Sequence, residues 1–312
     1  MIIITGGLGF IGSNILAKFN ELKNNNIVLV DSYSKKKFKN IKNLKYVDYF
    51  NKNEFIDNLL KSKFKNITHI FHQGACTNTQ ETDSEYLFKN NYEYSKKLLQ
   101  FCNNNRVKFI YASSASVYGN NIKTELIKEN LMTKNLSNAY AYSKYLFDAY
   151  VLKNKKKLKN TVGLRYFNVY GNNESHKLNM SSPILTFYRQ LKKKNFCNIF
   201  GKYGGFKNGM HSRDFIYIDD VVNINLWAAN KQIVDIINVG TGYDVTFKDI
   251  ALKIIQKIGK GKIKFIPFPN KFKKKYQTYT RADLTKLRYY SYKSMITNID
   301  DGIDLYLKKL ET

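Results

Sequence analysis

Tyr140 and Lys144 are the two side chains of this chain best spaced for acid–base chemistry, because they lie four residues apart in the segment Tyr140-Ala-Tyr-Ser-Lys144. In a helix they would share one face, one turn apart. A tyrosine acts as a general base near neutrality only if its pKa falls from about 10, at a cost of about 4 kcal/mol for three units. A lysine ammonium and a cationic nicotinamide ring could share that cost. The spacing alone is common on helix surfaces, so its meaning depends on the elements around it.

Ser114 supplies a third group for the same chemistry. It follows the apolar run that begins at Lys108, in the segment Ala112-Ser-Ser-Ala-Ser-Val-Tyr-Gly119. A strand that ends here would place the Ser114 hydroxyl at the carboxyl edge of a sheet, where open α/β sheets bind ligands. There it could hold a reacting hydroxyl by a hydrogen bond.

The first thirteen residues predict the element that positions a cofactor. The β-branched run Ile2–Thr5 leads directly into glycines at positions 6, 7, 9 and 12 and then into helix-compatible sequence. Such a turn needs glycine for positive φ, for close approach of a pyrophosphate and for tight contact between helix and strand. Free N–H groups at the helix start favour phosphate. Asp31 ends the next apolar run and is placed to bind ribose hydroxyls. The pattern predicts a dinucleotide site, and the alternative is a glycine turn in another βαβ unit.

Strands and amphipathic helices alternate through the first half of the chain, as a parallel sheet covered on both faces requires. The predicted strands are Ile2–Thr5, Ile27–Asp31, Leu44–Val47, Ile67–Gln73, Lys108–Ser113, Thr161–Arg165, Asp214–Ile218, Ile236–Val239 and Ile263–Ile266. The predicted helices are Phe10–Lys23, Asn53–Lys61, Ser84–Asn103, Tyr140–Lys153, Val221–Asn230 and Thr246–Ile258. We therefore expect an α/β protein with a doubly wound Rossmann sheet, formed by residues 1–167 and 212–243. Residues 168–211 and 244–312 would form a smaller, interleaved α/β substrate-binding lobe.

The net charge of +28, from 52 basic and 24 acidic residues, has two interpretations. It could mark a face that binds a polyanion such as nucleic acid. The lysines, however, occur in scattered short runs beside many Asn, Ile, Tyr and Phe, which favours a codon bias instead. We expect no nucleic-acid partner and no membrane partner, since no apolar run approaches a membrane span. The three cysteines and four histidines lack metal-binding spacing, so we expect no metal site and a cytoplasmic protein.

Three of these segments, the glycine turn, the Ser114 segment and the Tyr140–Lys144 pair, together resemble the extended short-chain dehydrogenase/reductase superfamily of NAD-dependent epimerases and dehydratases. Further segments resemble the ADP-L-glycero-D-manno-heptose 6-epimerase family, from Met1 to at least Asp283. They are His72–Thr77 (HQGACT), Asn90–Lys96 (NNYEYSK), Arg165–Gly171 (RYFNVYG), His176-Lys177, Arg213–Tyr217 (RDFIY) and Tyr276-Gln277.

The resemblance implies an enzyme that holds NADP tightly and recycles it within one turnover. Tyr140 would take the proton of the C6″ hydroxyl as hydride leaves, and the 6″-ketone would reorient and receive hydride on its other face. Lys177 would serve the opposite epimer as acid or base, which requires a pKa lowered from about 10.4. The product would supply lipopolysaccharide inner-core synthesis. Relatives form rings of identical subunits, so the resemblance implies a homo-oligomer.

The resemblance also assigns binding residues. For the cofactor, the positions are Gly6, Gly9, Phe10, Ile11, Gly12, Asp31, Ser32, Lys37, Lys52, Gln73, Gly74, Ala75, Cys76, Thr77, Asn90, Lys144, Val169 and Lys177. For the substrate, they are Asn168, Phe200, Arg213 and Tyr276. Asp31 by itself favours NAD because a carboxylate repels a 2′-phosphate. Lys37 and Lys52 could offset that repulsion, and the resemblance favours NADP.

This chain departs from the family pattern at a few positions. Gln73 stands where Glu is frequent, Asn179 where relatives carry Ser, Thr186 where some carry His, and Gly201–Tyr203 differ from the usual F-E-G-S run. Another nucleotide-sugar epimerase, dehydratase or dehydrogenase therefore stays open, although Ala115-Ser116 after Ser114 lack the acidic residues of a 4,6-dehydratase. The non-enzyme alternative is a dinucleotide sensor or polyanion binder on the same fold. Such sensors typically lose the Tyr-Lys pair.

Overall fold

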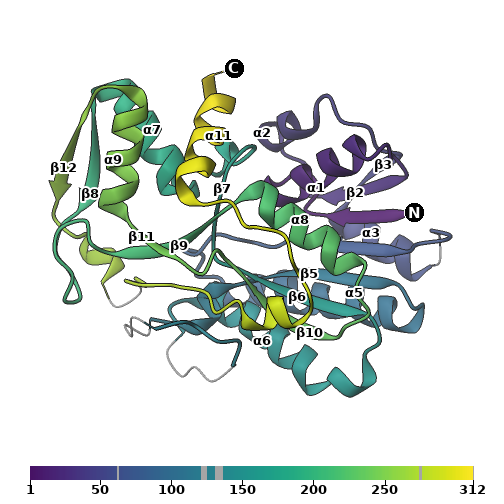
Figure 1. Ribbon diagram of the computed structural model, residues 1–312. Coiled ribbons are helices and arrows are strands. Elements are labelled where there is room, and N and C mark those ends of the chain that lie inside the picture. The colour runs from purple at the N-terminus through teal and green to yellow at the C-terminus, as the bar shows by residue number, and fades with distance from the viewer. Residues whose placement is uncertain (62, 121–124, 131–135, 274–275, 312) are drawn as a thin grey trace. The chain divides into compact units, whose positions relative to one another are not determined.

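The computed structural model describes residues 1–312 except 62, 121–124, 131–135, 274–275 and 312 (Figure 1). It contains two compact units, between which the chain passes several times. The first unit comprises Met1–Val117, Asn138–Arg165 and Val221–Ile237, and the second comprises Tyr118–Ser137, Tyr166–Asp220 and Asn238–Thr312.

The first unit is built on a seven-stranded sheet with strand order β10-β6-β5-β4-β1-β2-β3. The strands are β1 (Ile2–Thr5), β2 (Ile27–Asp31), β3 (Asp48–Asn51), β4 (His69–His72), β5 (Lys108–Ser114), β6 (Thr161–Tyr166) and β10 (Asp235–Val239). The pairings from β3 through β2, β1 and β4 to β5 are parallel. The strand order reverses between β1 and β4, which is the point where such sheets bind ligands at the carboxyl ends of the strands. The predicted doubly wound α/β fold is confirmed.

Helices cover this sheet. They are α1 (Phe10–Glu21), α2 (Lys35–Phe38), α3 (Lys52–Leu60), α4 (Ser84–Leu87), α5 (Tyr94–Asn104), α6 (Ala139–Lys153) and α8 (Ile218–Ala229), with short helical turns at η1 (Lys39–Ile41), η3 (Ala115–Tyr118) and η4 (Lys155–Lys157). Buried Phe55, Leu98 and Phe147 pack α3, α5 and α6 against Ile3 and Phe109 of the sheet. Figure 1 shows α1 and α8 on the opposite side of the strands from α5 and α6.

Two predictions about elements of the first unit were wrong. The third strand is Asp48–Asn51 and not Leu44–Val47. It is an edge strand of half-buried and exposed residues that pairs with β2 through its backbone, so it lacks an apolar run. The predicted helix Ser84–Asn103 is broken by a π-helical turn, η2 (Phe88–Glu93), between α4 and α5.

The second unit contains two small sheets. Among the residues that the structure describes, one has the order β11-β9-β7, formed by β7 (Asn168–Tyr170), β9 (Ser212–Tyr217) and β11 (Asp244–Thr246), and the other pairs β8 (Phe196–Phe200) with β12 (Lys262–Ile266). Its helices are α7 (Pro183–Lys194), α9 (Phe247–Ile258), α10 (Thr285–Tyr289) and α11 (Ile299–Glu311), with turns η5 (Ser175–Met180) and η6 (Asn270–Phe272). The sequence pattern did not indicate β7, β8, β11, α7, α10 or α11.

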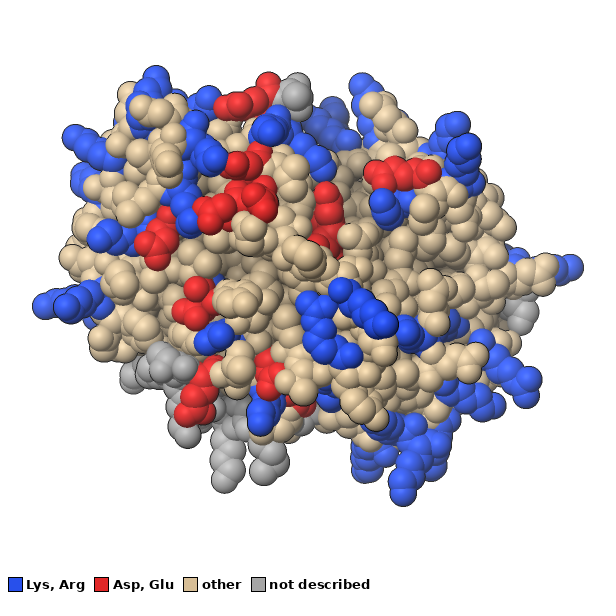
Figure 2. Space-filling model, in the orientation of Figure 1, with Lys and Arg blue, Asp and Glu red and all other residues tan. Residues whose placement is uncertain are grey.

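Basic side chains are spread over the face seen in Figure 2, with acidic side chains among them. Some form surface ion pairs, such as Lys257 with Asp304 at 2.7 Å and Lys89 with Glu85 at 2.6 Å. Exposed pairs of this kind contribute about 0–1 kcal/mol each, so they add little to the stability of the fold. Within the described part of the chain, no helix is both long and apolar enough to traverse a membrane.

Candidate active site

The glycine turn between β1 and α1 has the backbone geometry that its sequence predicts. Gly6 has a φ of +68° and its N–H donates to the Val30 carbonyl at 2.7 Å. The Gly9 N–H donates to the Gly6 carbonyl at 2.9 Å, which closes the turn. A Cβ atom on Gly12 would lie 2.3 Å from the Gly6 oxygen, so only glycine fits there. The turn therefore brings the start of α1 against the strand, as a pyrophosphate site requires.

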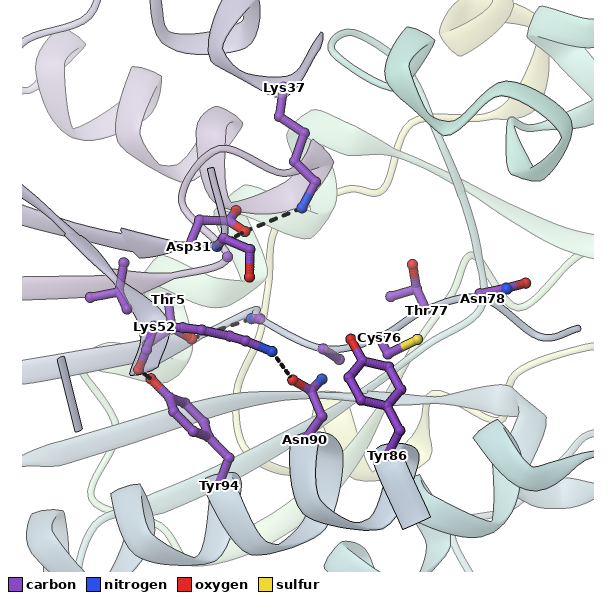
Figure 3. Close-up of a pocket in the computed structure, with 15 residues that line it drawn as sticks. Thr5, Asp31, Lys37, Lys52, Cys76, Thr77, Asn78, Tyr86, Asn90 and Tyr94 are labelled. Carbon is purple, nitrogen blue, oxygen red and sulfur yellow. Dashed lines mark hydrogen bonds and ion pairs between the residues drawn. The ribbon is translucent and has the colours of Figure 1, made fainter. Parts of the chain in front are cut away.

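A cavity of about 320 Å³ lies at the carboxyl ends of β1, β2 and β4 (Figure 3). Ten of the predicted cofactor residues line it: Gly6, Asp31, Ser32, Lys37, Lys52, Gly74, Ala75, Cys76, Thr77 and Asn90. Five lining residues were not predicted: Thr5, Val30, Asn78, Tyr86 and Tyr94. The cavity has the polar groups and the backbone turn that a dinucleotide needs.

The Asp31 carboxylate makes several contacts within the protein. It accepts hydrogen bonds from the backbone of Leu8 at 3.1 Å and of Ser32 at 2.7 Å. The Lys37 ammonium forms an ion pair with it at 3.2 Å. The carboxylate thus ties the glycine turn to the end of β2, and Lys37 offsets its charge at the edge of the cavity (Figure 3).

A chain of amides connects the cavity to α6. Lys52 donates to the side chain of Asn90, whose amide donates to Asn91 at 2.9 Å. Asn91 accepts from the Cys76 N–H at 2.8 Å, and its amide nitrogen donates to the Cys76 carbonyl and to the Ser143 hydroxyl, each at 3.0 Å. Burial lowers the pKa of the Lys52 ammonium. Asn91 lies in the π-helical turn η2, a distortion that often marks functional positions.

His72 is a buried structural residue beneath the cavity. Its ring nitrogens contact the Thr5 hydroxyl at 2.6 Å and the Ser95 hydroxyl at 2.7 Å. Burial lowers the pKa of the imidazole to about 3, with a smaller contribution from Lys144. The ring is therefore neutral at physiological pH, and it connects β1 to α5.

Tyr140, Lys144 and Ser114 come together in the first unit. Ser114 is the last residue of β5, and Tyr140 and Lys144 lie in the first two turns of α6. Burial raises the pKa of the Tyr140 phenol to about 12, although a hydrogen bond with Ser114 acts in the opposite direction. Burial lowers the pKa of the Lys144 ammonium to about 8, while Asp148 acts to raise it. The Lys144 ammonium donates to the Ala112 carbonyl at 2.9 Å.

The protein alone does not lower the pKa of Tyr140, contrary to the fall that a base near neutrality needs. The Tyr140 phenol is therefore protonated at neutral pH. A cationic ring at the adjacent cofactor site would act in the required direction, because a nearby positive charge favours the phenolate.

Asp148 fixes α6 against the sheet. Its buried carboxylate accepts from the Tyr111 hydroxyl at 2.9 Å, the Ser113 hydroxyl at 2.8 Å and the Arg165 guanidinium at 2.7 Å. Asp148 and Arg165 are both fully buried. The network thereby connects the helix that carries Tyr140 to the strand that ends at Ser114.

In the second unit, Lys177 lies in η5, in the loop from Gly171 to Ser182. Burial lowers the pKa of its ammonium, while Glu174 acts to raise it. This direction is the one that an acid–base lysine needs. Val169 lies in β7, the strand that precedes this loop.

The predicted substrate residues of the second unit form an aromatic and cationic group. The Arg213 guanidinium, which is 6% exposed, lies over the Tyr276 ring at 4.9 Å. The Tyr276 and Phe200 rings are 6.2 Å apart, and both line a cavity of about 280 Å³. Asn168 donates from its amide to the Asp214 carbonyl at 2.9 Å, so that group positions β7 against β9. Thr186 also lines the cavity.

Comparison with known proteins gives the family. Residues 2–240 match the model of the NAD dependent epimerase/dehydratase family. The chain belongs to that family.

Several solved structures resemble this member of the epimerase/dehydratase family over nearly its whole length. The ADP-L-glycero-D-manno-heptose-6-epimerase of Helicobacter pylori is 29% identical with a TM-score of 0.86, and the match covers 100% of this chain and 96% of that one. The UDP-N-acetylglucosamine 4-epimerase of Methanobrevibacter ruminantium, in complex with UDP-N-acetylmuramic acid, is 25% identical with a TM-score of 0.85, covering 99% and 97%. The UDP-glucose 4-epimerase of Thermotoga maritima is 24% identical with a TM-score of 0.84, covering 99% and 98%.

These comparisons confirm the predicted superfamily and its NAD(P) dependence, and they make the chain an enzyme of the epimerase/dehydratase family. They include epimerases of different nucleotide sugars, so the substrate is a separate question. Across the described residues, no group of three or more histidine, cysteine or acidic side chains could hold a metal ion.

Sequence reasoning missed three residues that organise the site of this family member: Asn91, Asp148 and Glu174. Asp148 had a usable signal, because it lies four residues after Lys144 and eight after Tyr140, on the same face of α6. Asn91 stands beside the predicted Asn90, and helical periodicity does not reveal a π-helical turn. Glu174 had no local signal.

Proposed function

We propose that this enzyme converts ADP-D-glycero-β-D-manno-heptose to ADP-L-glycero-β-D-manno-heptose by inverting C6″, for lipopolysaccharide inner-core synthesis. The observation that carries the proposal is the full-length similarity to the Helicobacter pylori enzyme, at 29% identity. The arrangement of Tyr140, Ser114 and Lys144 supports the oxidation and reduction steps that such an inversion needs.

In this proposal, Tyr140 takes the proton of the C6″ hydroxyl as the carbon is oxidised. Ser114 holds that hydroxyl through a hydrogen bond, and Lys144 provides positive charge near the phenol. The nicotinamide cofactor, when bound, accepts the hydride and returns it. The 6″-ketone then reorients so that its other face receives the hydride. Lys177 acts as the acid or base for the C6″ hydroxyl of the opposite epimer. Its lowered pKa supports that role, because a lysine with an ordinary pKa is fully protonated at neutral pH.

We propose NADP as the cofactor. Asp31 would repel a 2′-phosphate, but its carboxylate is already paired with Lys37 and hydrogen-bonded by two backbone N–H groups. Lys52 lines the same cavity. These two cations favour a 2′-phosphate at the edge of the site.

Cofactor titrations test this preference. Lys37→Ala should weaken the binding of NADPH at least tenfold and the binding of NADH much less, as followed by the fluorescence of the reduced nicotinamide. The matched control is Lys36→Ala, since Lys36 is an exposed neighbour. Equal losses for both cofactors, or none, would remove Lys37 from 2′-phosphate recognition.

The competing proposal is a 4-epimerase of a UDP-sugar. The structures of two such enzymes match with TM-scores of 0.85 and 0.84, close to that of the heptose epimerase. The deciding experiment offers ADP-D-glycero-β-D-manno-heptose, UDP-glucose and UDP-N-acetylglucosamine in parallel and reads the product configuration by NMR. Inversion at C6″ of the heptose alone supports the first proposal, and inversion at C4″ of a UDP-sugar alone supports the second.

A further inference from the structure

Glu174 is a fully buried carboxylate in the loop that carries Lys177. It accepts hydrogen bonds from the Gly171 N–H at 3.2 Å, from the Ser182 N–H at 2.5 Å and from the Ser182 hydroxyl at 2.7 Å. Gly171 and Ser182 are the two ends of the loop, so one side chain closes it. A buried carboxylate that accepts several hydrogen bonds stays where those donors hold it.

The same contacts join the loop to rigid elements on both sides. Gly171 follows β7, and a Cβ atom there would lie 2.4 Å from the Ile218 side chain. Ser182 is the N-cap of α7, and its hydroxyl also accepts from the Leu185 N–H at 3.2 Å. The negative charge of Glu174 therefore lies at the N-terminus of a twelve-residue helix, where the helix dipole favours it.

Inside the closed loop the backbone is strained. Leu178, directly after Lys177, has a φ of +50°, and Asn173, directly before Glu174, has a φ of +70°. The Lys177 N–H donates to the Glu174 carbonyl at 2.9 Å, which makes the turn between them. Positive φ at a residue such as leucine costs of order 1–3 kcal/mol and persists only where surrounding contacts hold it. The side-chain contacts of Glu174 hold the two ends of the loop, and the Ser181 N–H donates to the Leu178 carbonyl at 3.1 Å within it.

We propose that Glu174 is a positioning residue for Lys177: its carboxylate closes the Gly171–Ser182 loop into the turn that presents the lysine and gives its ammonium a negative countercharge. The inference rests on the proposed acid–base role of Lys177. Tyr306 of α11 interacts with Glu174, and Arg189 of α7 and Tyr217 of β9 interact with Tyr306 in turn. Tyr306 is buried and its pKa is raised, so it is neutral and leaves Glu174 as the anion that acts on Lys177.

The countercharge has a defined chemical use. Burial favours the neutral amine of Lys177, whereas Glu174 favours the ammonium. A group that must give up a proton in one half of a cycle and take one up in the other works best when neither form dominates. Glu174 therefore keeps Lys177 able to donate a proton to the carbonyl oxygen when hydride returns.

Trace acetylation of Lys177 tests the inference without any substrate. The rate at which acetic anhydride modifies Lys177 is followed against pH by mass spectrometry, which gives the titration midpoint of this one amine. In Glu174→Gln the amide keeps one acceptor oxygen for the Gly171 N–H and the Ser182 hydroxyl, so the loop can stay closed while the charge is lost. The midpoint should then fall by at least about half a pH unit. If Glu174 only keeps the loop folded, its loss would expose Lys177 and the midpoint would rise toward about 10.4.

Two further variants complete the experiment. Ser175→Ala changes an exposed neighbour in the same loop and should leave the midpoint unchanged. Glu174→Asp retains the charge, and its midpoint should stay closer to that of the wild type than the midpoint of Glu174→Gln. If Glu174→Gln does not fold, Glu174→Asp decides alone. A Lys177 midpoint that rises toward about 10.4 in that variant overturns the inference, and a midpoint near the wild-type value supports it.

Epimerisation provides a separate readout. The rate should depend on the Lys177 ammonium, so its alkaline limb should move to lower pH in Glu174→Gln, in parallel with the acetylation midpoint. If the wild-type enzyme does not epimerise the heptose, the proposed function is wrong, but the acetylation midpoints still test whether Glu174 acts on Lys177. A midpoint that does not move in Glu174→Gln would defeat the inference while epimerisation continued.

Discussion

The buried pair of Asp148 and Arg165 allows a quantitative prediction about the scaffold beneath Tyr140. Both side chains are fully buried and their ion pair is 2.7 Å long. Asp148→Asn keeps the shape but removes the negative charge, which leaves a buried guanidinium uncompensated. Loss of one partner of a buried pair costs about 3–5 kcal/mol. Since whole proteins have stabilities of about 5–15 kcal/mol, this variant should lose a large fraction of its stability.

A double-mutant cycle separates the ion pair from its surroundings. Arg165→Met leaves the carboxylate unpaired and should also destabilise by about 3–5 kcal/mol. The double variant removes both charges, so its cost should fall short of the sum of the single costs by about 2–3 kcal/mol. The assay is equilibrium unfolding in urea, followed by circular dichroism. The control is Asp57→Asn, at an exposed position of α3, which should change stability by less than about 0.5 kcal/mol.

Two results would refute this reasoning. A free energy of unfolding for Asp148→Asn within about 1 kcal/mol of the wild type would show that the guanidinium is solvated or otherwise compensated. Additive single and double costs would show that the two side chains act independently, despite their contact.

Three further predictions concern the site. Tyr140→Phe should retain the fold and the bound cofactor but lower turnover at least about a hundredfold, because the proton acceptor is lost; unchanged turnover in the epimerisation assay would exclude Tyr140 as the base. Lys177→Met should abolish interconversion of the epimers while single-face hydride transfer continues, as seen in cofactor fluorescence; wild-type rates would make Lys177 structural. His72, with its pKa lowered to about 3, stays neutral in the folded state while the unfolded chain binds a proton below about 6.5. The contribution of His72 to stability is therefore complete above pH 6.5 and is lost at about 1.4 kcal/mol per pH unit toward pH 3, so His72→Asn should reduce the slope of acid unfolding curves by about that amount.

The parts of the fold that could be predicted are those with strong local patterns. Ile2–Thr5 and Ile27–Asp31 are apolar runs, and the structure forms strands over the same residues. The glycine turn was predictable because Gly12 tolerates no side chain. Edge strand β3 was misplaced because its residues are exposed or half-buried, so no apolar pattern marks it.

The residues that position the catalytic groups of the candidate site were harder to predict from the sequence. The role of Glu174 depends on hydrogen bonds from Gly171 and Ser182, which lie close together only in the folded loop. The pKa of Tyr140 depends on burial, which one residue type at one spacing does not reveal. Lys177 appears in the sequence as one of many basic residues, and only its likeness to a family motif singled it out.

The measurement that tests the central claim most directly is the configuration at C6″ after incubation with ADP-D-glycero-β-D-manno-heptose. The enzyme should convert this substrate to a mixture of the D-glycero and L-glycero epimers without added cofactor, as seen by NMR of the sugar protons. In deuterated water the carbon-bound hydrogen at C6″ should be retained, because hydride leaves and returns within one site. An unchanged heptose together with inversion of a UDP-sugar at C4″ would contradict the account.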